Sequence, residues 1–134
     1  MNTLLIVDDD SDARFVIRRY AQRRNLAIDD AASFEGALTW VERYGAPTLA
    51  LCDVCMPGRD GCDLAEWFRT TCPDTPVIMV SALTDFSVAV RCLRLGVSDW
   101  LTKPLSPQGV QRAIERGLAR TVSYAPPADP AGSL

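Results

Sequence analysis

The hydrophobic positions of this chain fall into short apolar runs that alternate with longer amphipathic stretches. Three runs are strongly apolar and bounded by turn residues, which is typical of strands buried on both faces of a parallel sheet. Two weaker runs of the same kind indicate edge strands. The predicted strands are Leu4–Val7, Leu26–Ile28, Thr48–Cys52, Pro76–Val80 and Val97–Leu101.

The stretches between these runs carry apolar residues at helical spacing. The first predicted helix begins near Ser11 and the second behind Ser33, both candidate N-caps. Residues 86–95 are apolar nearly all round, so part of this helix should face solvent or a partner. The other predicted faces are Ala13, Val16, Ile17 and Tyr20; Phe34, Ala37, Leu38 and Val41; Leu64, Trp67, Phe68 and Thr71; and Val110, Ala113, Ile114, Gly117 and Leu118.

Strand-then-helix units in series predict an α/β fold, an open, doubly wound parallel sheet with helices on both faces. With 134 residues, of which 48% are hydrophobic, the chain fits one domain with one core. We assign that domain to residues 1–121. Residues 122–134 contain prolines and alanines without periodicity, which predicts a linker or disordered tail.

Composition narrows the functional classes. A net charge of −3 argues against direct nucleic-acid binding by this domain. The sequence predicts neither a membrane span nor a signal peptide, so we expect a cytoplasmic protein. The five cysteines should be reduced thiols. Cys52-x-x-Cys55 has no second pair at metal spacing and the chain has no histidine, so we place Cys52 in the core and Cys55 in a loop.

Polar residues follow four of the predicted strands. They are Asp8-Asp9-Asp10, Asp53, Ser81 and Lys103-Pro104. In an open α/β sheet the ligand site lies beyond the carboxyl ends of the strands, near the point where the strand order reverses. Two like charges about 4 Å apart repel by roughly 4 kcal/mol at an effective dielectric near 20, so clustered carboxylates require a cation. Lys103 supplies one positive charge, and Mg²⁺ suits the remaining oxygens.

This set of residues fits phosphoryl transfer onto a carboxylate. Asp53 is the predicted nucleophile and forms an acyl phosphate. The metal and Lys103 hold the phosphoryl oxygens, and Ser81 donates a hydrogen bond to the new group. Asp10 and Asp12 are assigned to helix capping and solvent.

Over residues 1 to about 120 the sequence resembles the receiver domains of two-component response regulators. Each motif alone is modest evidence, but their order and their placement after strands make the set specific. The match rests on Ile6-Val7-Asp8-Asp9, Asp53-Val54-Cys55-Met56-Pro57-Gly58-Arg59-Asp60-Gly61, Val80-Ser81-Ala82 and Leu101-Thr102-Lys103-Pro104-Leu105.

The resemblance implies a (βα)₅ fold with strand order 2-1-3-4-5. It further implies that Asp53 takes phosphate from a phosphohistidine on a sensor histidine kinase or phosphotransfer protein, or from a small donor. The implied Mg²⁺ ligands are Asp8 (largely through water), Asp9, Asp53 and the backbone carbonyl of Cys55. Ser81 and Lys103 sense the phosphoryl group, the Lys103–Pro104 peptide is cis, and Trp100 occupies the position of the aromatic switch residue.

The family pattern also implies an output face, formed by the helix over residues 86–95, the strand after it and the last helix. Such faces commonly mediate homodimerisation, and an effector domain commonly follows the receiver. Two departures stand out. Trp100 is bulkier than the usual Tyr or Phe, which disfavours its inward rotation. Cys55 and Leu83, two positions beyond Asp53 and Ser81, are poor at positioning water, which favours a long-lived phosphorylated state.

Two other functions compete with this interpretation. Asp8-x-Asp10 with a later lysine is similar to haloacid-dehalogenase-type phosphatases, but those need further acids after a late strand, where this chain has Pro104, Leu105 and Ser106. The second alternative is a receiver-like interaction module that no longer accepts phosphate. All expected site residues are present, which argues against it. We therefore predict a signalling switch rather than an enzyme.

Overall fold

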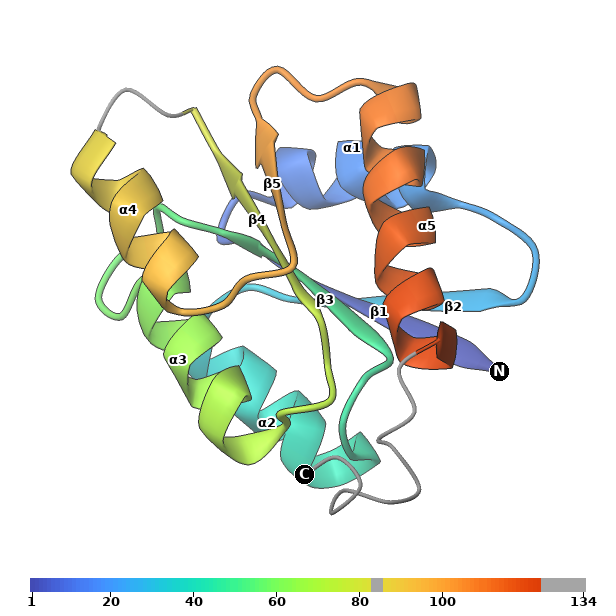
Figure 1. Ribbon diagram of the computed structural model, residues 1–134, viewed down its shortest axis with the longest axis horizontal. Helices are drawn as coiled ribbons and strands as arrows, with labels where there is room; N and C mark the ends of the chain where they lie inside the picture. The colour runs from blue at the N-terminus through green and yellow to red at the C-terminus, as the bar shows by residue number, and fades with distance from the viewer. Residues whose placement is uncertain (83–85, 124–134) are drawn as a thin grey trace, which may run out of the picture.

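The computed structural model describes residues 1–82 and 86–123 and shows a five-stranded parallel sheet in the order β2-β1-β3-β4-β5. Helices flank the sheet on both sides (Figure 1). The predicted fold class and strand order are therefore confirmed. The strands are β1 (Asn2–Val7), β2 (Leu26–Ala31), β3 (Leu49–Asp53), β4 (Val77–Ser81) and β5 (Asp99–Thr102). The helices are α1 (Ser11–Ala21), α2 (Phe34–Tyr44), α3 (Gly61–Thr71), α4 (Phe86–Arg94) and α5 (Pro107–Ser123).

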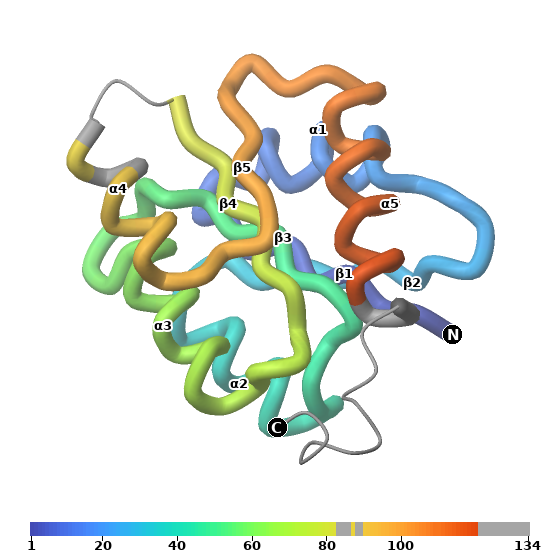
Figure 2. The backbone as a smooth tube through the Cα atoms, viewed as in Figure 1, coloured from blue at the N-terminus to red at the C-terminus, as the bar shows by residue number. Residues whose placement is uncertain are grey.

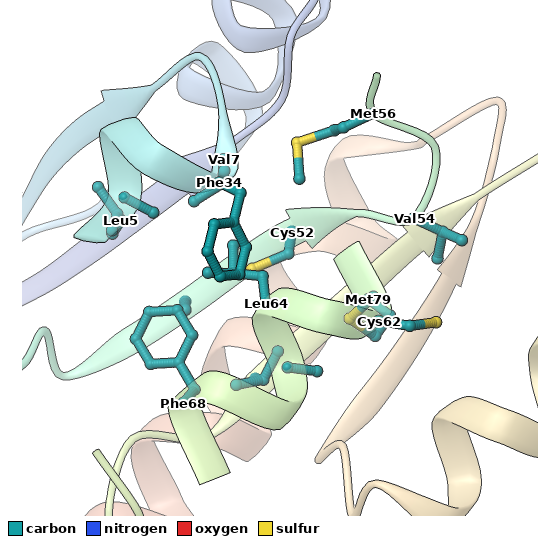
Figure 3. Close-up of a cluster of buried hydrophobic side chains, with 14 of the residues drawn as sticks. Leu5, Val7, Phe34, Cys52, Val54, Met56, Cys62, Leu64, Phe68 and Met79 are labelled. Carbon is teal, nitrogen blue, oxygen red and sulfur yellow. The ribbon is translucent and has the colours of Figure 1, made fainter. Parts of the chain in front are cut away.

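Two helical layers cover the sheet. In Figure 2, α1 and α5 lie on one side of the strands, and α2, α3 and α4 lie on the other. Alternate residues of each strand point to opposite faces, so every central strand contributes to two separate apolar clusters. Figure 3 shows the cluster under α2 and α3, where Phe34, Cys52, Leu64, Phe68 and Met79 are buried. The cluster under α1 and α5 contains Ile6, Ile17, Leu51, Ile78 and Ile114.

Local side-chain contacts define the helix starts. The predicted Ser11 cap is wrong, because Ser11 is the first helical residue and the Asp10 carboxylate accepts from the Asp12 backbone N–H. Ser33 caps α2 as predicted. At α3 the Asp60 and Asp63 side chains form a reciprocal capping box.

Two residues of the predicted apolar helix faces are exposed, and so is one apolar residue of α4. Val16, predicted to be buried, is 39% exposed, because α1 buries the narrow stripe through Ile17 and Ala21, and Val16 lies about 100° from Ile17 around the helix. Thr71, in the last turn of α3, is also exposed. On α4, the 74% exposure of Leu93 confirms that the apolar surface of this helix exceeds what the sheet can bury.

The strand pairing brings the predicted polar residues into line. β3 and β4 each extend one residue beyond their predicted ends and include Asp53 and Ser81. Asp53 pairs with Val80 and Ser81 pairs with Thr102. Within the described residues no helix is long and apolar enough to cross a membrane. The tail predicted over residues 122–134 lies outside the described residues from 124 onward.

Candidate functional site

The site lies where the strand order reverses. β2 pairs with one edge of β1, and β3 pairs with the opposite edge of β1. Val7 pairs with Cys52, so Asp8 and Asp53, the residues that follow, lie side by side at the carboxyl edge of the sheet. This is the position at which open α/β sheets bind ligands.

Three carboxylates converge at this edge. Asp8, Asp9 and Asp53 each offer an oxygen, and these oxygens all lie within 4.8 Å of one another. Asp8 and Asp53 are 1% and 5% exposed, whereas Asp9 is exposed. Two of the carboxylates are thus buried in the protein while the third faces solvent. Such an acidic triad can hold a metal ion and leaves room for water or a phosphate oxygen in the coordination sphere.

Lys103 supplies the positive charge of the site. Its Nζ lies 3.6 Å from Asp53 Oδ1 and 3.9 Å from Asp8 Oδ2. The Lys103 backbone N–H donates to the Ser81 carbonyl at 2.8 Å, which joins the residue after β5 to the end of β4. The Lys103–Pro104 peptide is cis, as the resemblance implied. One ammonium against three carboxylates leaves a net negative charge.

The Asp8 carboxylate is only partly satisfied. Its Oδ1 accepts from the Asp10 backbone N–H at 2.9 Å. Its Oδ2 is buried and has no hydrogen-bond partner among the described residues. Burial raises the pKa of Asp8, and the charge of Asp53 raises it further, against the opposing effects of the Asp10 N–H and Lys103. A buried, unsatisfied oxygen beside two other carboxylates fits a metal ligand.

Asp53 resembles Asp8 in its environment. Burial raises the pKa of Asp53, while the Lys103 ammonium and the Cys55 backbone N–H favour its charged form. Lys103 therefore orients and partly neutralises this carboxylate. The remaining acceptor capacity of Asp53 is available to a cation or to an electrophile.

The Asp8→Asn variant tests whether the burial of Asp8 beside Asp53 destabilises the metal-free protein. The measurement is the free energy of unfolding as a function of pH. The pKa of Asp8 is higher in the folded protein than its ordinary value of 3.8. Protonated Asp8 therefore contributes stability that is fully present below 3.8 and is lost as pH rises through the folded-state pKa. The amide does not titrate. In EDTA we expect Asp8→Asn to be more stable than the parent by about 1–2 kcal/mol at neutral pH, with the gain shrinking toward acid.

Urea unfolding at a series of pH values measures this difference. Mg²⁺ should stabilise the parent but not the variant, so the advantage of Asp8→Asn should disappear at millimolar Mg²⁺. A stability difference that is constant across the pH range would contradict the proposed strain at Asp8.

The other predicted residues lie around this centre. Ser81 is buried at the end of β4. Trp100 lies in β5 beside Met79 and packs against the cluster under α2 and α3, and its ring Nε1 is buried without a hydrogen-bond partner in the described part of the chain. Cys55 is exposed just after β3, and Cys52 is buried in it, as predicted. The roles of Ser81 and Trp100, and the Cys55 carbonyl as a ligand, stay predictions; Leu83 lies outside the described residues.

Two residues that support the site were given no role by the sequence analysis. Arg14 Nη1 donates to the Asp8 carbonyl at 2.7 Å and fixes the turn after β1. Gly61 begins α3 directly against β3, and its N–H donates to the Val54 carbonyl at 3.0 Å. An added Cβ at Gly61 would overlap the Asp53 carbonyl oxygen. Gly61 was visible in the motif after Asp53, but Arg14 carries no signal in a single sequence.

Fold and site together define a doubly wound α/β domain with an acidic, lysine-bearing site at the reversal of strand order. The family model of the response regulator receiver domain matches residues 4–115. The chain therefore belongs to the response regulator receiver domain family. This membership makes it a signalling domain of two-component systems rather than a conventional enzyme, and it removes the haloacid-dehalogenase alternative.

The chain is similar to longer regulators. It is 32% identical over 117 residues to the transcriptional regulatory protein ResD of Bacillus subtilis (strain 168), covering 87% of this chain and 48% of ResD. It is 34% identical over 125 residues to the transcriptional regulatory protein GltR of Pseudomonas aeruginosa, covering 88% of this chain and 49% of GltR. The chain thus spans about half the length of these two relatives.

Solved structures show the same fold. A CheY-like response regulator receiver domain protein from Methanospirillum hungatei JF-1 superimposes with a TM-score of 0.84 at 24% identity, covering 92% of this chain and 98% of that chain. NtrX from Brucella abortus superimposes with a TM-score of 0.83 at 25% identity, covering 92% of this chain and 28% of that chain. The described fold is therefore the receiver fold.

Proposed function

We propose that this domain is a switch operated by Mg²⁺-dependent phosphorylation of Asp53. The observation that carries the proposal is the convergence of Asp8, Asp9 and Asp53 within 4.8 Å, with Lys103 Nζ 3.6 Å from Asp53 Oδ1. In this proposal Asp8, Asp9, Asp53 and the Cys55 carbonyl hold the metal. When bound, Mg²⁺ neutralises charge on the site and on the phosphoryl oxygens.

The chemistry assigned to the chain is a substitution at phosphorus. A carboxylate oxygen of Asp53 attacks the phosphorus of a phosphohistidine on a sensor kinase or phosphotransfer protein, or of a small acyl phosphate. The new P–O bond gives an acyl phosphate. The bond between phosphorus and the donor atom breaks, and the donor atom keeps the electron pair of that bond. Lys103 stabilises the negative charge of the phosphoryl group, and the Ser81 hydroxyl donates a hydrogen bond to it.

The phosphoryl group biases a conformational equilibrium, because Ser81 and Lys103 gain contacts available only in the phosphorylated state. We assign the resulting change to Trp100 and to a surface formed by α4, β5 and α5, on which Leu93 is 74% exposed. This surface is the proposed site of homodimerisation. The response is passed to an effector domain C-terminal to the described residues, as the length of ResD and GltR favours.

Under this proposal the receiver itself does not contact nucleic acid, because its net charge is −3. It acts in the cytoplasm, a compartment that agrees with its free cysteines.

Phosphorylation by acetyl phosphate tests the proposal directly. With Mg²⁺ present, intact-mass spectrometry should detect an increase equal to one phosphoryl group, and peptide mapping should place it on Asp53. EDTA should reduce the adduct to background, because the acidic site then lacks its cation. A chain that takes up no phosphoryl group with Mg²⁺ would instead support the interaction module.

The same adduct allows its lifetime to be measured. The exposed Cys55 thiol, two residues beyond Asp53, is a poor group for positioning an attacking water. We expect the phosphorylated protein to decay slowly after the donor is removed. A half-life of seconds with Mg²⁺ present would contradict this part of the proposal.

A further inference from the structure

A pair of thiols lies between α3 and α4 and has no role in the proposed phosphorylation chemistry. Cys62, in the first turn of α3, and Cys92, near the end of α4, have their Sγ atoms 3.2 Å apart and share a hydrogen bond. They are 1% and 0% exposed, and both are free thiols. Figure 1 shows α3 and α4 side by side, and the pair joins these two helices through cysteines that are 30 residues apart in the sequence.

We propose that Cys62 and Cys92 form a reversible disulfide when the protein meets a peroxide, and that this bond fastens α4 onto α3. A disulfide requires the sulfurs to approach to about 2.05 Å, so each sulfur must move by only about half an ångström or slightly more from its present position. Side-chain rotation supplies such a shift. The shared hydrogen bond already points the two sulfurs at each other.

The oxidation balances with hydrogen peroxide as the two-electron oxidant. A thiolate sulfur of Cys62 attacks one peroxide oxygen, the O–O bond breaks, and the leaving hydroxide takes up a proton to give water. The Cys92 sulfur then attacks the resulting sulfenic acid, the S–O bond breaks, and a second water leaves. Two thiols lose two electrons and two protons, and one peroxide becomes two waters.

The surroundings of the two thiols prevent this reaction while α4 packs on α3. Burial raises the pKa of Cys62, and the charges of Asp60 and Asp63 raise it further, against the opposing effects of its hydrogen bond with Cys92 and of Arg91. Burial raises the pKa of Cys92 to about 12. While α4 packs on α3, both thiols are buried and mostly protonated, and peroxide cannot reach them. Oxidation must therefore follow a displacement of α4 from α3. The reduced pair is stable until that displacement occurs, which agrees with the reduced thiols expected from the sequence.

The bond would strengthen a weak contact. Besides the two thiols, Arg91 of α4 forms ion pairs of 3.2 Å with Asp63 and 3.7 Å with Asp60. The Arg91 side chain is 51% exposed, and ion pairs this open contribute little. A covalent bond would hold α4 in its present position. If the proposed function is correct, the disulfide therefore opposes the change in α4 that phosphorylation brings about.

The experiment treats the full chain with hydrogen peroxide, alkylates the remaining thiols after denaturation and maps the peptides without reduction. We expect a peptide in which Cys62 is linked to Cys92, reversed by dithiothreitol, and a Tm higher by roughly 10 °C in the oxidised protein. Cys92→Ser should lose both results. Cys72→Ala, which removes another buried thiol, should keep both.

Three outcomes would overturn the proposal: linkage through Cys55, sulfinic acids in place of the disulfide, or a lower Tm after oxidation. The link to the switch has its own measurement. Prior treatment with acetyl phosphate and Mg²⁺ should accelerate formation of the bond by roughly threefold or more, because displacement of α4 exposes the thiols. A disulfide formed at the same rate in both states contradicts only this link, whereas a chain that takes up no phosphoryl group contradicts the proposed function.

Discussion

Replacing Asp53 by asparagine is expected to abolish phosphoryl uptake from acetyl phosphate while leaving the fold intact. An amide is a far weaker nucleophile than a carboxylate and cannot form the acyl phosphate, so the rate should fall by at least about a thousandfold. The folded domain should not lose stability. Asp53 is buried against two other carboxylates, so removing its charge should stabilise the metal-free protein by about 1 kcal/mol.

Asp10→Asn is the matched control for this substitution. Asp10 carries the same charge two residues from Asp8, but its side chain caps α1 by accepting from the Asp12 backbone N–H. Asparagine is an equally good N-cap, so stability should be unchanged. Intact-mass spectrometry should detect a normal adduct in Asp10→Asn and none in Asp53→Asn. An adduct of undiminished size in Asp53→Asn would place the phosphoacceptor elsewhere and refute the proposed site.

The gathering of Asp8 and Asp53 at one edge of the sheet could be predicted because each follows a strongly apolar run, whereas Lys103 follows a weaker one. An apolar run followed by an acid, a hydroxyl or a lysine is a local signal, and parallel strands bring such signals to one edge. The helix caps show the limit of this reasoning. Ser11 and Asp10 are both good N-caps, and only the backbone conformation shows that Asp10 lies outside the helix.

Features that depend on contacts between distant segments could not be predicted. Val16 belongs to the same apolar repeat as Ile17, and its exposure depends on how α1 is rotated over the sheet. The Cys62–Cys92 pair depends on the packing of two helices, and neither cysteine has a neighbour in sequence that indicates the other. Arg14 carries no signal in a single sequence, yet its guanidinium donates a hydrogen bond to the carbonyl of Asp8.

Replacing Gly61 by alanine should have the largest effect on stability of any small substitution near the site. An added Cβ would overlap the Asp53 carbonyl oxygen and would lie 2.8 Å from the Asp53 carbonyl carbon and 2.9 Å from Val54 Cα. These are backbone atoms of a buried strand, so the overlap cannot be relieved by rotating a side chain. Relief requires α3 to move away from β3, and we expect a loss of roughly 3 kcal/mol. The gain in helix propensity, about 1 kcal/mol at most, is smaller.

Gly36→Ala is the matched control, because Gly36 also lies in the first turn of a helix. Its added Cβ would meet only side-chain atoms, the Ser33 Oγ at 3.2 Å and the Ala31 Cβ at 3.5 Å, so the stability of Gly36→Ala should differ from that of the parent by less than about 1 kcal/mol. Urea unfolding measures both variants. Because the strained backbone in Gly61→Ala carries Asp53, phosphoryl uptake at a temperature where the variant is folded should also slow, by about tenfold or more. A destabilised Gly61→Ala that still takes up phosphate at the parent rate would show that the start of α3 supports the fold without positioning the phosphoacceptor.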